Sequence, residues 1–377
     1  MWQYAMQPFF YVVLFPWGCG YLCSMITVKS DFKAKEFSCS VPDVVLYIGS
    51  GEYADIVMVA TKDGENTEIF NERLYPDSTG TIEVVEMDRL VEAYAEQWLV
   101  FTLTVRMTDA AGASSQLSTQ VVSCKAMMQN ITAVDFCNTR FLTLLDGKRP
   151  TADGWLEFLT YIGTDAASCV AYYTDGTSRT FSVEHTTYHS DYSMIDVSPS
   201  LFKTDGKQLL RYVVTAGERT QEYEVITDYD PDIAPILLFF NSFGVQELAY
   251  CIGEHQMVSS YDRKQARIGR KKENYLIDEK STFKADTGIL TFPMASWWRE
   301  VFRSKDVQVM QLGEDGKIDE NSGVPVVINT EKVEVSNAAD HLPRYTFEYE
   351  YADRNHNIFD VRREGRIFDN TFDYTFN

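Results

Sequence analysis

The sequence lacks the short motifs that mark most soluble enzymes. It contains no G-x-S-x-G nucleophile motif, no glycine-rich phosphate loop and no dinucleotide-binding fingerprint. The regular alternation of strands and helices that such motifs need is also missing. The sequence therefore predicts no catalytic residue and no cofactor, and we expect a protein that is not an enzyme.

Positive charge is scarce. The 377 residues include 34 Lys and Arg against 55 Asp and Glu, so the net charge is -21 and the pI is about 4.6. A protein this acidic has little attraction for the phosphates of DNA or RNA, and we exclude nucleic acid as a partner. With 45% hydrophobic and 24% charged residues, the composition is that of a folded protein, and the length suits two or three domains.

Cysteines with metal-binding spacing are also absent. The seven cysteines are scattered, no C-x-x-C pair occurs, and Cys19 and Cys23 form an isolated C-x₃-C pair without a nearby histidine. This pattern argues against a disulfide scaffold or a zinc site. It predicts mostly free thiols buried as small hydrophobic groups.

Two other segments resemble metal sites only in part. In "HTTYHSD", His185 and His189 would share one face of a helix, but the residues between them favour a strand, which separates them by about 13 Å. In "DYDPD", the residues Asp228, Asp230 and Asp232 resemble half of a calcium loop. An EF-hand is excluded because Ile233 replaces the required glycine. A solvated linker is the favoured interpretation, with an interdomain calcium site as the alternative, and we predict no metal.

The first 24 residues are apolar and allow several interpretations. No basic residue precedes Lys29, so the positive region of a signal peptide is missing, and Pro8 and Pro16 interrupt the run that a membrane helix would need. A lipoprotein cleavage site at Cys19 would have unsuitable residues before it. We therefore expect residues 1–24 to be either an apolar leader or a wrongly assigned start, with translation beginning at Met25.

The remaining pattern predicts a mainly β protein. Short strands separated by turns fill residues 25–125, with one helical turn at "MDRLVEAYAEQ", and residues 126–229 repeat this order. Each half has a hairpin over Asp-Gly and a later one over Ala-Gly: Asp63-Gly64 with Ala111-Gly112, then Asp175-Gly176 with Ala216-Gly217. This repetition predicts two tandem immunoglobulin- or fibronectin-like β-sandwiches.

A third, β-rich unit is expected at residues 230–356, followed by an arm at 357–377. It starts after a proline-stiffened linker with a hairpin formed by two apolar runs around Asn241, Ser242 and Gly244, and it contains one helix near Ser296 to Arg303. Because this hairpin directly follows the linker, we expect it to set the orientation of the third unit against the sandwiches.

The third unit also holds the candidate binding residues. Six basic residues lie within ten positions: Arg263, Lys264, Arg267, Arg270, Lys271 and Lys272. They predict either a solvated loop or edge strand, or a docking surface for an acidic partner, which includes a second copy of this chain. In "SWWREVF", Trp297 and Trp298 are expected to pack in the core, with a platform for stacking a glycan as the alternative.

The order of these segments resembles structural proteins of phages and prophages of Bacteroidetes. The features that carry the resemblance are "NERLYPDSTGTIEV", the turn "FFNSFGVQELAYC", "SWWREVF", "VPVVIN" and "YTFEYEYAD", although Val245 stands where a second glycine is usual. The resemblance implies a tail or baseplate protein of a virion, assembled in the bacterial cytoplasm through contacts with other virion or tail proteins and as a homo-oligomer. The alternative is an exported adhesin at the cell surface that binds a host surface glycan.

Overall fold

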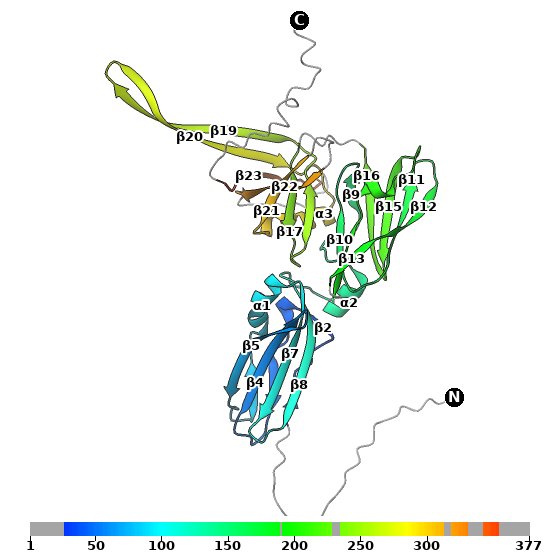
Figure 1. Cartoon of the computed structure of the whole chain (residues 1–377), viewed down its shortest axis with the longest axis vertical. Helices are drawn as coiled ribbons and strands as arrows, with labels where there is room; N and C mark the ends of the chain where they lie inside the picture. Colours follow the sequence, from blue (N-terminus) through cyan, green and yellow to red (C-terminus); the bar gives the residue numbers. More distant parts are fainter. Residues whose placement is uncertain (1–25, 189–190, 228–233, 313–317, 331–341, 354–377) are drawn as a thin grey trace, which may run out of the picture.

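The computed structural model describes residues 26–188, 191–227, 234–312, 318–330 and 342–353, and in these residues the chain is mainly β (Figure 1). Two β-sandwiches are followed by a seven-stranded sheet with one helix. The predicted fold class is therefore confirmed. The predicted leader at residues 1–24, the arm at 357–377, His189 and the acidic linker residues Asp228, Asp230 and Asp232 lie outside the described residues.

The first sandwich pairs a five-stranded sheet with a three-stranded one. The larger sheet has the order β2-β8-β7-β4-β5, and the smaller has the order β1-β3-β6. The strands of the larger sheet are Lys35–Phe37, Ser114–Val122, Val100–Asp109, Ala54–Lys62 and Glu65–Leu74. Those of the smaller sheet are Thr27–Val28, Val44–Tyr47 and Thr81–Val84. The predicted helical turn is α1, Met87–Gln97, whose Met87, Val91 and Ala95 are buried.

The second sandwich repeats this plan. Its larger sheet has the order β9-β16-β15-β11-β12 and its smaller sheet the order β10-β14-β13. The larger sheet comprises Arg149–Ala152, Arg219–Ile226, Leu209–Ala216, Ala167–Tyr173 and Ser178–Val183. The smaller sheet comprises Phe158–Ile162, Tyr192–Asp196 and His185–Tyr188.

The two larger sheets have the same topology. In each, the first strand pairs in parallel with the last, β2 with β8 and β9 with β16. The other neighbours are antiparallel: two hairpins in each sheet, joined through β4 with β7 and β11 with β15. The Asp-Gly and Ala-Gly turns close the hairpins at the predicted places because their glycines adopt a positive φ, such as 84° at Gly64 and 60° at Gly217. Both larger sheets therefore have the same hairpins, and glycine-containing turns at matching positions close them.

The C-terminal sheet has the strand order β18-β17-β21-β22-β23-β20-β19. Its strands in this order are Gln246–Tyr250, Ile236–Phe240, Val307–Leu312, Ile318–Ile328, Thr346–Tyr351, Lys271–Asp286 and His255–Ile268. The predicted hairpin is confirmed, since β17 and β18 pair from Ile236 with Tyr250 to Phe240 with Gln246.

Two helices differ from the prediction. Helix α3, Phe292–Arg303, starts four residues earlier than predicted because the Thr291 hydroxyl accepts a hydrogen bond from the backbone N–H of Met294 and caps the first turn. Helix α2, Ala133–Thr139, was not predicted. It begins after Thr132, whose hydroxyl accepts a hydrogen bond from the N–H of Asp135. Both helix starts are marked by a capping threonine, which a prediction from the spacing of apolar residues does not take into account.

Candidate functional site: the hairpin arm and its buried base

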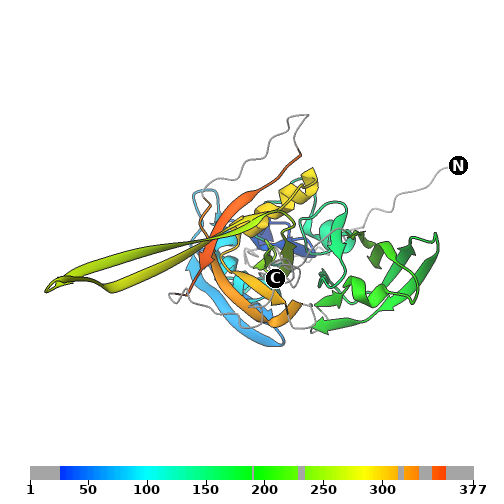
Figure 2. The same cartoon turned by 90° about the horizontal axis from the view of Figure 1, so that it is seen from above.

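Strands β19 and β20 form a long hairpin that projects from the C-terminal sheet (Figures 1 and 2). The strands contain 14 and 16 residues, and Gly269 provides a positive φ of 63° in the turn between them. β20 pairs with β23 only from Phe283 to Asp286. Beyond these residues the hairpin is a two-stranded ribbon, and we call residues 257–282 the arm.

The arm exposes apolar side chains that a two-stranded ribbon has no core to bury. Among them, Met257 is 64% exposed, Ile268 65% and Tyr275 66%. Four other exposed apolar side chains are Val258, Tyr261, Leu276 and Ile277. Isolated hairpins are marginally stable in water, and grouped apolar side chains on a surface usually mark a contact with another molecule.

The distal half of the arm holds the six basic residues. Arg263, Lys264, Arg267, Arg270, Lys271 and Lys272 are all exposed, and none forms an ion pair with another described residue. The structure therefore places these six residues in a projecting hairpin. The predicted edge strand describes only those on β19, since Lys271 and Lys272 lie on β20. The segment from 263 to 272 contains no acidic residue.

Like charges lie opposite each other at two levels of the arm. Arg267 pairs across the strands with Lys272, and Asp262 pairs with Asp278. Direct cross-strand neighbours of equal charge destabilise a hairpin. The arm therefore carries electrostatic repulsion, and an acidic partner would relieve the part of it that arises between Arg267 and Lys272.

The three units meet at the β17–β18 hairpin, which forms the edge of the C-terminal sheet opposite to β19. The β17–β18 turn is organised by Asn241, whose side-chain oxygen accepts hydrogen bonds from the N–H groups of Phe243 and Val245 at 2.9 and 3.1 Å. Its amide donates to the carbonyl oxygen of Leu142 at 2.8 Å and to Glu247 Oε1 at 2.5 Å. The fully buried Phe243 ring lies 5.1 Å from that of Phe136 and 6.2 Å from that of Phe37 in the first sandwich.

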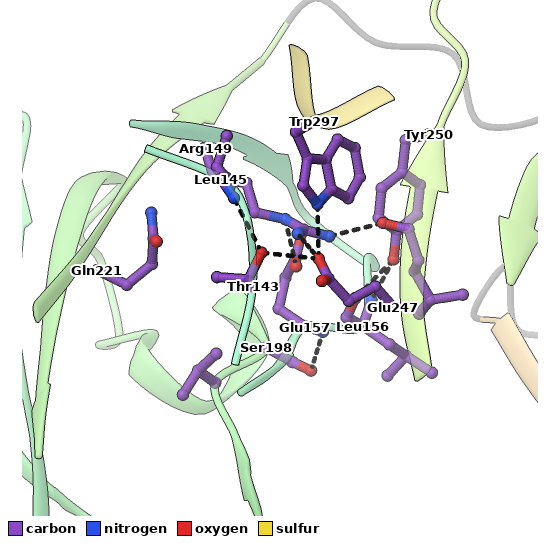
Figure 3. A network of polar contacts seen from close by, with 12 residues as sticks. Thr143, Leu145, Arg149, Leu156, Glu157, Ser198, Gln221, Glu247, Tyr250 and Trp297 are labelled. Carbon is purple, nitrogen blue, oxygen red and sulfur yellow. Dashed lines mark hydrogen bonds and ion pairs between the residues drawn. The ribbon is translucent and has the colours of Figure 1, made fainter. Parts of the chain in front are cut away.

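A buried charged network joins the second sandwich to the C-terminal sheet (Figure 3). Arg149 on β9 donates from Nε to Glu157 Oε2 at 2.8 Å and from Nη1 to Glu247 Oε2 at 3.2 Å. Its Nη2 also donates to the carbonyl oxygen of Leu248 at 2.6 Å. Glu247 Oε2 accepts a further hydrogen bond from Trp297 Nε1 at 2.8 Å, and the Arg149 guanidinium lies 4.8 Å from the centre of the Trp297 ring.

Burial dominates the electrostatics of this network. Desolvation raises the pKa of Glu157 to about 7, although the neighbouring Arg149 opposes the shift. Burial lowers the pKa of Arg149, but neighbouring groups that include Glu157 and Glu247 raise it by more, so the guanidinium stays charged. Arg149 and Trp297 line a cavity of only about 40 Å³. A larger cavity of about 460 Å³ is lined by Thr143, whose hydroxyl donates to Glu247 Oε2. The network itself can hold the second sandwich and the C-terminal sheet together.

The two candidate tryptophans belong to the core. Trp297 and Trp298 are each 1% exposed, and both pack in the apolar cluster beneath α3. The prediction that these tryptophans pack in the core fits their burial. The alternative, in which they contact a partner or stack on a glycan at the surface, does not. The structure does not bring them together with the six basic residues, which lie at the far end of the arm.

The sequence patterns did not predict a role for Arg149, Glu157 or Glu247. The available signal was a charged residue inside an apolar strand, as at Glu247 in "VQELAY". Such a residue is almost never fully buried unless it is paired. In the described residues, no group of three or more His, Cys, Asp or Glu side chains is arranged to hold a metal ion, and no helix there has the length and apolar character to span a membrane.

Comparisons with known proteins give fold-level similarity alone. No family model matches the chain, and no curated protein matches it. Solved structures that resemble it include a tetra-tandem repeat from the extending region of a large adhesion protein, at 10% identity and a TM-score of 0.23, covering 69% of each chain. An I-band fragment of titin matches at 11% identity and a TM-score of 0.17, covering 69% of this chain and 92% of that one.

A third similar structure is SGBP-B of the Bacteroides ovatus mixed-linkage glucan utilization locus, solved with a mixed-linkage heptasaccharide. It matches at 10% identity and a TM-score of 0.16, covering 83% of this chain and 74% of that one. The identities and TM-scores are too low to support any inference about a partner or ligand.

Proposed function

We propose that this chain is a non-enzymatic assembly protein and that its arm docks on an acidic surface of a second copy of the chain. The observation that carries this proposal is the arm itself, a two-stranded ribbon whose exposed apolar side chains and six exposed basic residues project from an acidic protein.

The apolar side chains and the strand edge supply the attraction. β19 is the last strand of the sheet, so one side of its backbone is open to a further strand. Residues such as Met257 and Tyr275 would be removed from water when another chain covers the ribbon. Full burial of a Met side chain contributes about 1.5–3 kcal/mol.

Charge complementarity selects the partner. The chain carries -21 despite the six basic residues between positions 263 and 272, so the surface of another copy is acidic. A basic arm on one protomer and an acidic body on the next form a heterologous contact, which can close into a ring. Such a ring fits the tail or baseplate component that the sequence resemblance implies, and the proposed localisation is the virion.

Light scattering tests the proposal. Wild type should form an oligomer at low salt that dissociates at high salt, and Arg270→Glu, Lys271→Glu and Lys272→Glu together should produce a monomer. The matched control changes Arg89, Lys148 and Lys203 to Glu, because these exposed residues lie outside the arm. Wild type that stays monomeric at every concentration in low salt would contradict the proposal.

One observation favours a second function, binding of a surface glycan. Tyr75 is 70% exposed, its ring lies 6.3 Å from that of Tyr53, and the Arg73 guanidinium lies 3.9 Å from the centre of the Tyr53 ring. An exposed aromatic ring such as that of Tyr75, supported by the half-buried Tyr53, can stack on a sugar ring. Under this alternative the protein is displayed at the cell surface, and Tyr75→Ala should abolish binding in a glycan array while leaving self-association unchanged.

A further inference from the structure

Two cysteines meet where the first sandwich passes into the rest of the chain. Cys39 lies in the short 3₁₀ helix Ser38–Ser40, and Cys124 follows the last strand of the sandwich. Both thiols donate to the carbonyl oxygen of Ala126, each at 3.2 Å. The two sulfur atoms therefore share one acceptor.

The backbone holds this pair in place. The Ser38 hydroxyl accepts a hydrogen bond from the N–H of Cys124 at 2.9 Å and donates to its carbonyl oxygen at 3.1 Å. The next residue, Lys125, donates its N–H to the carbonyl oxygen of Ser242 in the β17–β18 turn at 2.7 Å. A covalent bond between the cysteines would thus close a loop of the first sandwich beside its contact with the C-terminal sheet.

The two thiols differ in access and acidity. Cys39 is half-buried and Cys124 is buried, and both line a cavity of about 270 Å³. The hydrogen bond from Cys124 lowers the pKa of Cys39, whereas the same hydrogen bond and burial raise the pKa of Cys124. Cys39 is therefore the thiol that a small reagent can reach and that loses its proton first.

We propose that Cys39 and Cys124 are a redox-active pair that a low-molecular-weight disulfide, such as oxidised glutathione, converts to an intramolecular disulfide. The Cys39 thiolate attacks one sulfur of the oxidant, whose S–S bond breaks and releases one glutathione thiolate. Cys124 then loses its proton and attacks the Cys39 sulfur, and the second glutathione leaves. The protein gives up two electrons and two protons, and the oxidant becomes two glutathione thiols.

The test uses the full chain with Cys19→Ser and Cys23→Ser, so that only the five cysteines of the described residues remain. After incubation with oxidised glutathione, the intact mass should fall by two hydrogen atoms, and a non-reducing peptide map should show Cys39 linked to Cys124. Cys169, buried in the second sandwich, should stay reduced and is the internal control. Dithiothreitol should restore both thiols.

A variant identifies the order of attack. With Cys124→Ser, the protein should instead retain one glutathione on Cys39, because no second thiol can displace it. The oxidised parent should also unfold at a higher temperature than the reduced parent. If the parent protein keeps both thiols reduced, or accumulates glutathione on Cys39 without the linkage, the proposal is wrong. The peptide map of the parent decides this even if the variant does not fold.

Discussion

Arg149 Nη1 lies 3.2 Å from Glu247 Oε2, and this buried ion pair connects the second sandwich to the C-terminal sheet that carries the arm. The side chains of Arg149 and Glu247 are 7% and 5% exposed. Neither charge can turn to water if its partner is removed, so the junction depends on the pair remaining complete.

Replacing Arg149 should therefore weaken the junction strongly. Arg149→Met leaves Glu157 and Glu247 buried without their counter-charge, and we expect the free energy of unfolding to fall by about 3–5 kcal/mol. Urea denaturation followed by tryptophan fluorescence measures the loss. The control is Lys203→Met, which breaks an exposed ion pair with Asp153 and should change stability by less than about 1 kcal/mol. Equal effects of the two variants would contradict this account.

The turn at Asn241 should be similarly sensitive. Asn241→Ala removes two acceptor and two donor interactions from a residue that is 4% exposed, leaving the Leu142 carbonyl and Glu247 Oε1 with fewer partners. We expect a loss of about 2–3 kcal/mol. Asn66→Ala removes one exposed hydrogen bond with Thr61 and is the matched control, with an expected change within about 0.5 kcal/mol.

Glu157 should make stability depend on pH. Its pKa in the folded protein is raised to about 7, above the ordinary value of 4.5. The folded state therefore retains a proton that the unfolded state has lost, and the free energy of unfolding should fall as pH rises from about 4.5 to 7, by up to about 3 kcal/mol. Exposed carboxylates with lowered pKa, such as Asp175 at about 2, act in the opposite direction and only at lower pH.

The variant Glu157→Gln isolates this effect. The amide stays neutral at every pH, so denaturation measured between pH 5 and 8 should give a flatter profile than that of wild type. An unchanged slope in this variant would show that another group titrates. Glu222→Gln, at a partly exposed carboxylate, should leave the slope as it is in wild type.

Shortening the arm should separate assembly from folding. Ser259 and Ser281 are cross-strand partners, so an Asn-Gly turn can replace residues 260–280 while β20 keeps its pairing with β23. The shortened protein should unfold at nearly the same temperature as wild type but remain a monomer in light scattering. Loss of the folded core would show that the arm supports the C-terminal sheet, and retained self-association would show that docking uses another surface.

Local chemistry made much of the fold predictable. The turns at Asp63-Gly64 and Ala216-Gly217 require conformations that glycine adopts readily, so the repeated hairpins and the two sandwiches could be inferred from neighbouring residues. The hairpin at 236–252 was predictable for the same reason. The basic segment was also visible, because charge density is a property of consecutive residues.

Tertiary structure alone decided which of these features project and which are enclosed. The sequence around Arg263 is compatible with the edge of a sheet and with a two-stranded ribbon. Which of the two forms depends on where β23 stops pairing with β20. The hydrogen bond of Trp297 to Glu247 joins residues 50 positions apart, and that of Arg149 to Glu247 joins residues 98 positions apart, so neither leaves a local periodicity in the sequence. Composition and turns thus determined the sandwiches, and long-range packing determined the junction and the arm.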